Sequence, residues 1–338
     1  MLYNIQALRA IAALLVVFFH ARRHFQDMGL VSPVFEFIAR YGFMGVDIFF
    51  VISGYVMAKT SQKHAYGTAS GIKFLKIRLA RIYLGYWPFF ILAAIVLSFN
   101  PTVFSENINY FQSFFLLNTN ISKLVIGQAW TLSYEIYFYF MVTFLIVLKF
   151  LKPTQVLVSV FAIVLLINIS TNLEIDTLLG FFFSSYLLEF ISGYLLFTFW
   201  KYIADKKMLA ISVSLFICAY LIATYFNVGY DYKSVPIRVA TFGTTAFALV
   251  WTLLLLEKNN LLIIKGILKP MGDASYTLYL CHFTLLGLFY SSGLRAYLVE
   301  VDMAAFGFTL YVFAIIIFSL LFYKFIELPL YKKVRAKL

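Results

Sequence analysis

The chain has 338 residues, of which 63% are hydrophobic, 20% aromatic and only 12% charged. Because soluble domains carry about 25% charged residues, this composition excludes a water-soluble protein and predicts an all-α, polytopic membrane protein. A net charge of +12 would suggest nucleic-acid binding in a soluble chain. In a membrane protein, an excess of Lys and Arg in the cytoplasmic loops explains it more simply, so we expect no nucleic-acid partner.

Ten apolar segments have the length, about 20 residues, that a helix needs to cross a bilayer. They cover 5–21, 41–58, 82–99, 129–148, 155–172, 177–199, 208–226, 236–256, 274–292 and 303–323. A shorter run at 110–117 is expected to lie at the interface or to re-enter the membrane. No soluble domain or repeat interrupts the spans, which predicts one membrane-embedded domain over 1–338. Cys218 and Cys281 lie inside apolar segments and are expected to be buried free thiols.

The positive charges predict the orientation of the spans. With the N-terminus inside, the segments that face the cytoplasm are 59–81, 149–154, 200–207, 257–272 and 324–338. They hold 19 Lys and Arg residues, against 7 on the other side, with Arg9 inside the first span. We therefore expect both termini in the cytoplasm. Arg22 and Arg23 follow the first span where a cleavage site would need small residues, so no cleaved signal is expected.

The first span carries Arg9 and His20 on one helix face. They are eleven residues apart, which is about three turns and ~16 Å along the axis. Ionisable groups inside a membrane helix are costly and are candidates for function. A short anchor helix with snorkelling ends is the alternative.

The second span contains Asp47 among small residues that favour close helix contact, namely Gly42, Gly45, Ser53 and Gly54. A carboxylate at this depth needs a partner. It either takes part in the chemistry or forms a static pair with an arginine or a backbone amide.

A basic cluster follows the second span and consists of Lys73, Lys76, Arg78 and Arg81. Arg78 and Arg81 are three residues apart and therefore share a helix face. Two guanidiniums at the cytoplasmic mouth would bind a phosphate or diphosphate bidentately. Positive-inside topology combined with binding of anionic lipid is the alternative.

The fourth span begins near Trp130, an interface anchor, and places Glu135 about 7.5 Å further along the helix. A carboxylate at the depth of His20 would orient the imidazole and stabilise imidazolium. Lining of a pore or pairing of helices is the alternative for Glu135. Glu189 in the sixth span is a weaker candidate of the same kind.

In the ninth span Ser275, Tyr279 and His282 share one face, which would line a cavity or hold an inter-helix histidine.

Glu327-Leu-Pro329 predicts the end of the last helix. His64 is expected to be solvated. The four histidines are scattered and no Cys/His spacing suits zinc, so no metal is expected.

Together these motifs resemble the acyltransferase 3 family, the integral-membrane O-acyltransferases of bacterial polysaccharides, and in particular its exopolysaccharide O-acetyltransferase branch. The motifs are Arg9-x10-His20, Gly45-Val-Asp-Ile-Phe-Phe-Val-Ile-Ser-Gly54, Arg78-x-x-Arg81, Trp130-x-Leu-x-x-Glu135 and Tyr279-Leu-Cys-His282. One departure is Gln6, where many members have Asp. The resemblance implies ten core helices, acetyl-CoA as the donor, an essential histidine at His20, a functional Arg9 and a donor-side role for the Arg-x-x-Arg pair.

We therefore expect an enzyme of the bacterial inner membrane that transfers acetyl from cytoplasmic acyl-CoA to a sugar hydroxyl of an exopolysaccharide, O-antigen or lipid-linked glycan. Membrane lipid and a second copy of the chain are the other expected partners. His20 would deprotonate the hydroxyl or carry the acetyl group as an acyl-imidazole, and these two routes stay open. Glu135 is the first choice to orient His20 and Asp47 the second. The donor-binding set is Arg9, Lys73, Arg78 and Arg81, and the cavity-lining set is Ser53, Trp130, Tyr279 and His282.

Two other classes of protein fit parts of the pattern. A proton-coupled secondary transporter or flippase would use Asp47, Glu135 and His282 as a relay. Against it, no inverted repeat is visible in the sequence and no span is broken by proline at mid-depth. A catalytically silent assembly subunit would not require both Arg9 and His20.

Overall fold

The computed structural model describes residues 2–99, 107–148, 152–171, 173, 177–225 and 234–338. Within these ranges every regular element is a helix and no strand occurs, which confirms the all-α prediction. Lys149 and Lys233, two of the charges used to predict the orientation, lie outside the described residues.

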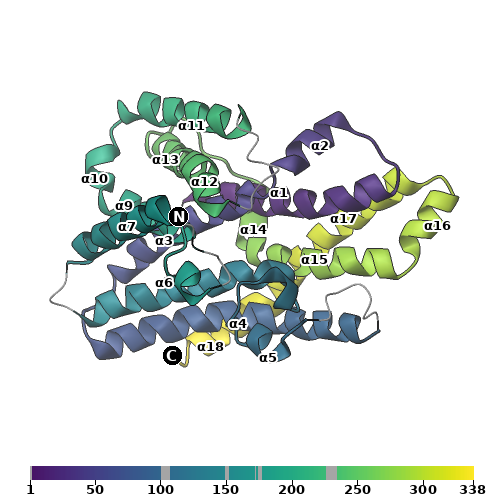
Figure 1. Ribbon diagram of the computed structural model, residues 1–338, viewed down its shortest axis with the longest axis horizontal. Helices are drawn as coiled ribbons and strands as arrows, with labels where there is room; N and C mark the ends of the chain where they lie inside the picture. Colours follow the sequence, from purple (N-terminus) through teal and green to yellow (C-terminus); the bar gives the residue numbers. More distant parts are fainter. Residues whose placement is uncertain (1, 100–106, 149–151, 172, 174–176, 226–233) are drawn as a thin grey trace. The chain divides into compact units, whose positions relative to one another are not determined.

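The helices follow the apolar segments of the sequence (Figure 1). The first half of the chain contains α1 (Tyr3–Asp27), α2 (Pro33–Arg40), α3 (Met44–Ser61), α4 (Thr68–Phe99), α5 (Tyr110–Phe114), η2 (Ile121–Lys123), η3 (Gly127–Ala129), α6 (Trp130–Val147) and α7 (Pro153–Ser170). The second half contains α8 (Leu178–Phe182), α9 (Tyr186–Thr198), α10 (Trp200–Ile203), α11 (Met208–Tyr225), α12 (Val235–Arg238), η4 (Val239–Gly243), α13 (Thr244–Lys258), α14 (Leu268–Asp273), α15 (Ser275–Ser291), α16 (Leu294–Glu300), α17 (Ala304–Phe322), η5 (Tyr323–Glu327) and α18 (Leu328–Arg335). The elements η4 and η5 are π-helices.

Eight helical stretches in the described ranges are long and apolar enough to cross a membrane, and the bent pair α2–α3 would make a ninth. All ten expected segments overlap helices. The ninth expected segment, 274–292, folds as α15, which has 17 residues and would cover about 26 Å of an apolar core that is ~30 Å thick. The chain is therefore a multi-pass membrane protein, and its orientation stays a prediction.

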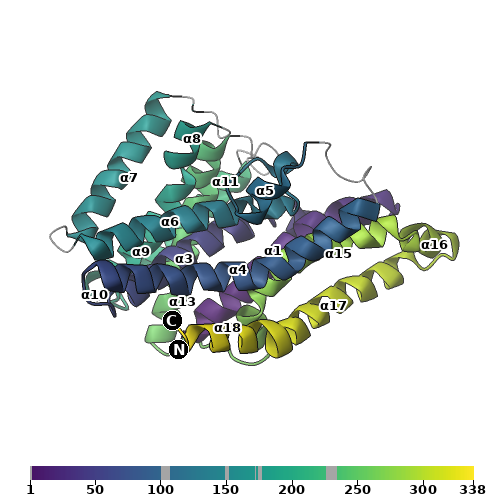
Figure 2. The same cartoon turned by 90° about the horizontal axis from the view of Figure 1, so that it is seen from below.

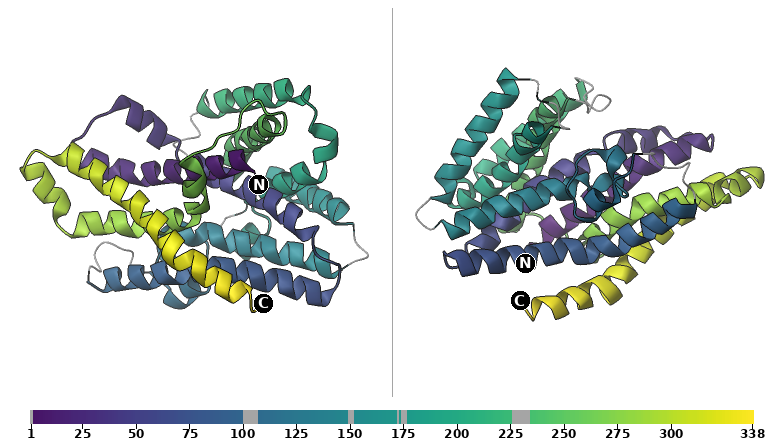
Figure 3. Two further views of the ribbon diagram at one scale, coloured as in Figure 1. Left: turned by 180° about the vertical axis from the view of Figure 1, so that it is seen from behind. Right: turned by 60° about the horizontal axis from the view of Figure 1, so that its bottom comes forward.

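The chain divides into two compact units. Unit 1 comprises Met1–Arg9, Val46–Leu79 and Tyr134–Lys269, and unit 2 comprises Ala10–Gly45, Ala80–Ser133 and Pro270–Leu338. In unit 1, α11 packs along α13, and α9 contacts both α7 and α13. In unit 2, α15 and α17 lie against each other and α16 joins them (Figure 3).

Within unit 1, α3 and α9 meet at two glycines. A Cβ atom on Gly54 would lie 1.9 Å from Phe190 O, and one on Gly193 would lie 2.0 Å from Val51 O. Because each glycine faces the backbone of the other helix, neither position has room for a side chain. The predicted close contact at Gly54 is therefore confirmed, and Gly193 is its counterpart.

Within unit 2, the start of α3 rests on α1 in the same way. A Cβ atom on Gly42 would lie 2.1 Å from Leu15 O, and one on Gly45 would lie 2.3 Å from Ala12 O. The predicted close contact is confirmed here as well, and it fixes the start of α3 against the middle of α1.

The basic segment after α3 is mostly helical. α4 has 32 residues, about 48 Å at 1.5 Å per residue, so it is longer than an apolar core of ~30 Å. Lys73 and Lys76 are exposed near its start, whereas Tyr86 and Phe89 in its second half are buried. The short run at 110–117 forms only α5, which has five residues.

The last helix does not stop at Glu327-Leu-Pro329, so this prediction was wrong. The chain is helical from Ala304 to Arg335, because α17 continues through η5 into α18 (Figure 2). The Leu328 N–H bonds Tyr323 O, five residues back, as in a π-helix. Pro329 follows in the first turn of α18, where its missing N–H costs little.

The two cysteines differ in burial. Cys281 on α15 is buried, as expected, whereas Cys218 on α11 is exposed, so the prediction was wrong for Cys218. Only 17% of the apolar stretch of α11 is buried within the protein. An apolar membrane helix faces lipid as readily as protein, and its sequence does not distinguish the two sides.

Candidate active site

A histidine pair forms the polar centre of unit 2. His282 on α15 is fully buried, and its Nε2 lies 3.1 Å from Nδ1 of His20 on α1. His20 Nδ1 is also 2.9 Å from Val16 O, and His282 Nδ1 is 3.0 Å from Leu278 O. Each ring is thus anchored to the carbonyl one turn earlier in its own helix and bonded to the other ring.

Aromatic and polar side chains support this pair. The Phe283 ring meets the His20 ring edge-on at 5.4 Å, and the Tyr279 ring lies 6.0 Å from that of His282. The Tyr279 hydroxyl donates to Gln128 O at 2.9 Å and lies 2.9 Å from Thr131 Oγ1. Tyr279, predicted to line a cavity, therefore ties α15 to the start of α6. Trp130, in the same set, is the half-buried first residue of α6.

A second buried group in unit 2 pairs with the basic motif of α4. Glu327 in η5 is 2% exposed, and its carboxylate lies 4.0 Å from the Arg81 guanidinium and accepts a hydrogen bond from the Thr277 hydroxyl. The Arg81 guanidinium also lies over the Tyr331 ring at 5.4 Å. Sequence reasoning missed Glu327, because the nearby proline suggested a helix end.

In unit 1, Asp47 forms a buried bidentate ion pair with Arg238. Arg238 Nε donates to Asp47 Oδ1 at 3.1 Å and Nη2 donates to Oδ2 at 2.8 Å. The third guanidinium nitrogen donates to the Tyr186 hydroxyl at 3.3 Å, and the guanidinium lies over the Tyr186 ring at 5.4 Å. The static pair with an arginine, one of the two readings of Asp47, is thus present. The signal for Arg238 was a single arginine inside an apolar segment.

Glu189 lies beside this ion pair on α9. Both of its carboxylate oxygens are buried and have no hydrogen-bond partner among the described residues. Gly243, at the end of η4, makes room for it, since a Cβ atom there would lie 2.5 Å from Glu189 Oε1. Unit 1 therefore buries three ionisable side chains together.

Glu135 has its own partners in unit 1. The Ser53 hydroxyl on α3 donates to Glu135 Oε1 at 3.1 Å, and the Tyr139 hydroxyl donates to the same oxygen. Glu135 is half-buried. The structure thus brings together two sequence candidates, Ser53 and Glu135. Glu135 belongs to unit 1 and His20 to unit 2.

The donor-side residues of unit 1 lie at the start of α4. Arg78 Nη2 donates to Thr60 Oγ1 at 2.6 Å, and its guanidinium lies over the Phe74 ring at 5.5 Å. His64, expected to be solvated, packs its ring 5.6 Å from that of Phe74. Burial, together with the positive charges of Arg78 and Lys73, lowers the pKa of His64 below its usual value.

The start of α1, also in unit 1, is held by Glu257 of α13. The backbone N–H groups of Tyr3 and Asn4 donate to its two carboxylate oxygens at 2.8 and 2.7 Å, which caps the positive end of the helix dipole. Arg9 follows less than two turns later, and its Nη1 lies 3.5 Å from Gln6 Oε1. The amide at Gln6, where an acid was expected from the resemblance, thus contacts the candidate arginine.

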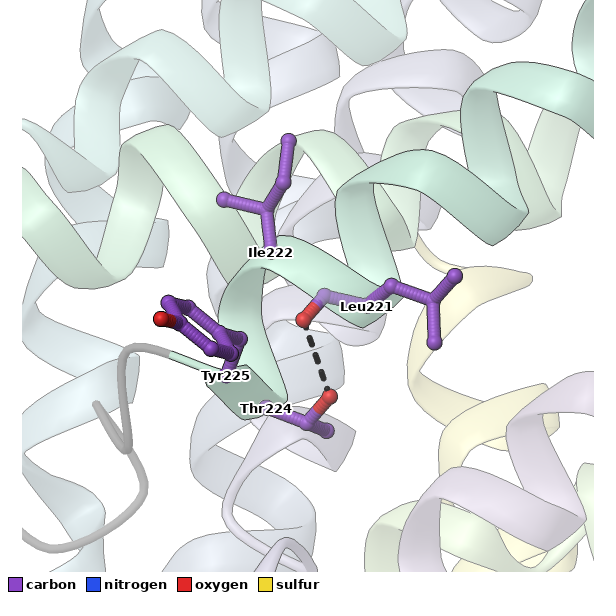
Figure 4. Close-up of a pocket in the computed structure, with 4 residues that line it drawn as sticks. All are labelled: Leu221, Ile222, Thr224 and Tyr225. Carbon is purple, nitrogen blue, oxygen red and sulfur yellow. Dashed lines mark hydrogen bonds between the residues drawn. The ribbon is translucent and has the colours of Figure 1, made fainter.

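In the part of the chain that the structure describes, no three His, Cys, Asp or Glu side chains gather to hold a metal ion. Figure 4 shows a hollow on the last turns of α11, lined by Leu221, Ile222, Thr224 and Tyr225. The Thr224 hydroxyl donates to the carbonyl of Leu221 in its own helix.

Comparison with known proteins points to one family. The profile of the acyltransferase 3 family, described as an acyltransferase domain, matches residues 2–324. The exopolysaccharide production protein ExoZ of Rhizobium meliloti (strain 1021) is 25% identical over 260 residues, 75% of this chain and 79% of that protein. The O-acetyltransferase OatA of Staphylococcus aureus (strain NCTC 8325 / PS 47) is 28% identical over 336 residues, 86% of this chain and 53% of that protein. The match thus spans about half the length of OatA. No solved structure matches the chain.

Proposed function

Because the chain belongs to the acyltransferase 3 family, we propose that it is a membrane O-acetyltransferase that moves an acetyl group from acyl-CoA to a hydroxyl of a glycan. The observation that carries the proposal is the family match over residues 2–324. The names of two relatives, an exopolysaccharide production protein and an O-acetyltransferase, support a polysaccharide or its lipid-linked precursor as acceptor. The bacterial inner membrane is the proposed location.

His20 is the proposed reacting group. In direct transfer, His20 Nε2 takes the proton of the sugar hydroxyl while the oxygen attacks the thioester carbonyl. The C–S bond then breaks, and the proton passes from the imidazolium to the thiolate, which leaves as the CoA thiol. In the covalent route, Nε2 attacks the thioester carbonyl, the C–S bond breaks and CoA leaves as its thiolate. The sugar hydroxyl then attacks the acetyl carbonyl, the bond to Nε2 breaks, and the hydroxyl proton passes to the thiolate.

Arg78, with Arg81, Lys73 and Arg9, is the proposed binding set for the donor phosphates. Among the described residues, Arg78 donates a hydrogen bond to a neutral hydroxyl at 2.6 Å, so its charge is available for an anion. Arg81 lies 4.0 Å from the buried Glu327 carboxylate, which offsets part of its charge. We therefore assign the principal phosphate contact to Arg78.

Glu135 is the proposed binding group for the acceptor hydroxyl. Its carboxylate already accepts from the hydroxyls of Ser53 and Tyr139, and a sugar hydroxyl is a donor of the same kind. The carboxylate of Asp47, in contrast, has both oxygens bound by Arg238. We assign Asp47 a structural role in unit 1.

The proposal is tested by complementing a strain that lacks the gene with wild type, His20→Ala or His24→Ala. His24 lies one turn further along α1 and serves as the matched control. Base-labile acetate on the surface glycan should return with wild type and His24→Ala and stay absent with His20→Ala. Purified wild type should also release CoA from acetyl-CoA when acceptor is added, which a transporter would not do. Full acetylation by His20→Ala would refute the role of His20, and no acetylation by wild type would refute the activity.

A further inference from the structure

We propose that His282 is a positioning residue that holds His20 in the tautomer protonated at Nδ1, so that Nε2 is the reacting nitrogen. The inference rests on the proposed function, in which His20 reacts with donor or acceptor. The role of His282 explains why Nε2 of His20, and not Nδ1, meets the substrate.

The tautomer of His282 follows from its backbone contact. His282 Nδ1 lies 3.0 Å from Leu278 O, and a carbonyl oxygen can only accept a hydrogen bond. Nδ1 of His282 therefore carries a hydrogen. In a neutral imidazole the other nitrogen is then unprotonated, so His282 Nε2 is an acceptor.

The tautomer of His20 follows in turn. Its Nδ1 faces two acceptors, Val16 O at 2.9 Å and His282 Nε2 at 3.1 Å. Neither can donate, so His20 Nδ1 carries the hydrogen and shares it between them. His20 Nε2 keeps its lone pair, and no hydrogen bond to it occurs among the described residues.

The arrangement also fixes the direction of the ring. A flip of the His20 ring would turn a carbon towards Val16 O and His282 Nε2 and would lose both contacts. Phe19 and Phe283 meet the His20 ring edge-on, at 5.2 and 5.4 Å, which restricts the same rotation. Because His282 is fully buried, no water replaces its Nε2 without cost. His282 thus does for His20 what a carboxylate does in a Ser-His-Asp triad, without a negative charge.

A matched pair of substitutions separates hydrogen bonding from packing. His282→Gln places an amide oxygen near the position of Nε2, whereas His282→Met has a similar length and no strong acceptor. We expect His282→Gln to keep kcat within about threefold of wild type. We expect His282→Met to lose about tenfold, because the Nδ1 hydrogen of His20 then keeps Val16 O but loses its second acceptor. The KM for acetyl-CoA should change in neither variant. Equal losses in Gln and Met would overturn the inference.

A spectroscopic readout tests the tautomer without reference to activity. The chain has four histidines, so the ¹⁵N spectrum of histidine-labelled protein in detergent is simple, and His20→Ala identifies the signals of His20. At mildly alkaline pH, Nδ1 of His20 should show the shift of a protonated nitrogen and Nε2 that of an unprotonated one. In His282→Met the two shifts should move towards each other as both tautomers become populated.

The outcomes distinguish the two proposals. A wild-type spectrum with His20 protonated at Nε2 would overturn the role of His282 even if His20→Ala abolishes acetylation. If His282→Met does not fold, the wild-type spectrum and the activity of His282→Gln still decide the matter. Full acetylation by His20→Ala would instead refute the proposed function, whatever the spectrum shows.

Discussion

Unit 1 and unit 2 each bury a polar cluster inside apolar helices, but the two clusters differ in what their hydrogen bonds leave unused. In unit 1, Arg238 bonds both oxygens of Asp47 and directs its remaining nitrogen at Tyr186. In unit 2, both hydrogen bonds of the His20 ring involve its Nδ1, and Nε2 of His20 keeps its lone pair. An ion pair such as Asp47–Arg238, in which both carboxylate oxygens are bonded, holds helices together, whereas a histidine ring with an unused lone pair can react. Burial of an ionisable group therefore does not by itself identify the catalytic centre.

The largest expected effect is on the fold of unit 1. Arg238→Met should lower the free energy of unfolding by about 3–5 kcal/mol, because it leaves the Asp47 carboxylate buried without a counter-charge. Adding Asp47→Asn should restore part of the loss, since a neutral amide is far less costly to bury. Denaturation of the purified protein in detergent measures both changes. His20→Ala is the control from unit 2 and should unfold close to wild type. If Arg238→Met and wild type have the same free energy of unfolding, the Asp47–Arg238 pair does not stabilise unit 1, and the contrast with the histidine pair of unit 2 fails.

The next effect concerns the two arginines of α4. Arg78→Ala should weaken acetyl-CoA binding about ten- to a hundredfold, the loss of one charge-assisted contact. Arg81→Ala should weaken binding less and should also destabilise the protein, because the Glu327 carboxylate, at 2% exposure, loses the positive charge beside it. The double variant Arg81→Ala, Glu327→Gln should recover that stability but not the affinity. Titration calorimetry with acetyl-CoA measures these affinities. If Arg78→Ala and wild type bind acetyl-CoA equally, Arg78 does not bind the donor and only reflects the positive-inside orientation of the chain.

A smaller effect is expected at Glu135. Glu135→Gln keeps the shape of the side chain but leaves one acceptor oxygen in place of two. The KM for the glycan should therefore rise several-fold, as expected for the loss of one ordinary hydrogen bond. The KM for acetyl-CoA should stay unchanged. Steady-state kinetics with each substrate varied in turn measure the two constants. A loss of kcat as large as that of His20→Ala would instead give Glu135 a direct part in the chemistry.

The smallest effect is electrostatic and lies outside the spans. The pKa of His64 should lie below its usual value because the ring is partly buried near Arg78 and Lys73. Lys73→Ala removes a positive charge and should raise this pKa, and CoA phosphates bound at Arg78 should raise it too. Titration of the His64 ring signals by NMR, with and without CoA, follows both shifts. A pKa that does not respond to CoA would place the phosphates elsewhere.

The sequence predicted where the helices lie, but it did not predict which side chains on different helices contact each other. An apolar run of about 20 residues and a glycine at a helix contact are local signals, so the spans and Gly42, Gly45 and Gly54 could be predicted. Asp47 was recognised as needing a partner, but its arginine is 191 residues away. No local pattern encodes such a distance.

The same limit applied to the histidines. His20 and His282 are 262 residues apart, and the spacing within α15 indicated only which residues share a face. His282 was therefore predicted either to line a cavity or to be an inter-helix histidine, and the ring that it contacts became visible only in the folded chain.

The π-helix η5 makes the direction of Glu327 depend on chain length as well as on residue type. A π-turn holds one residue more than the α-helix would need, and each residue of an α-helix adds about 100° of rotation. Inserting one residue near the end of α17, just before η5, would therefore turn Glu327 relative to α17 by about that angle. Every side chain would still be present, yet the carboxylate would no longer point at Arg81. Alanine scanning cannot detect a feature of this kind, whereas single-residue deletion and insertion can.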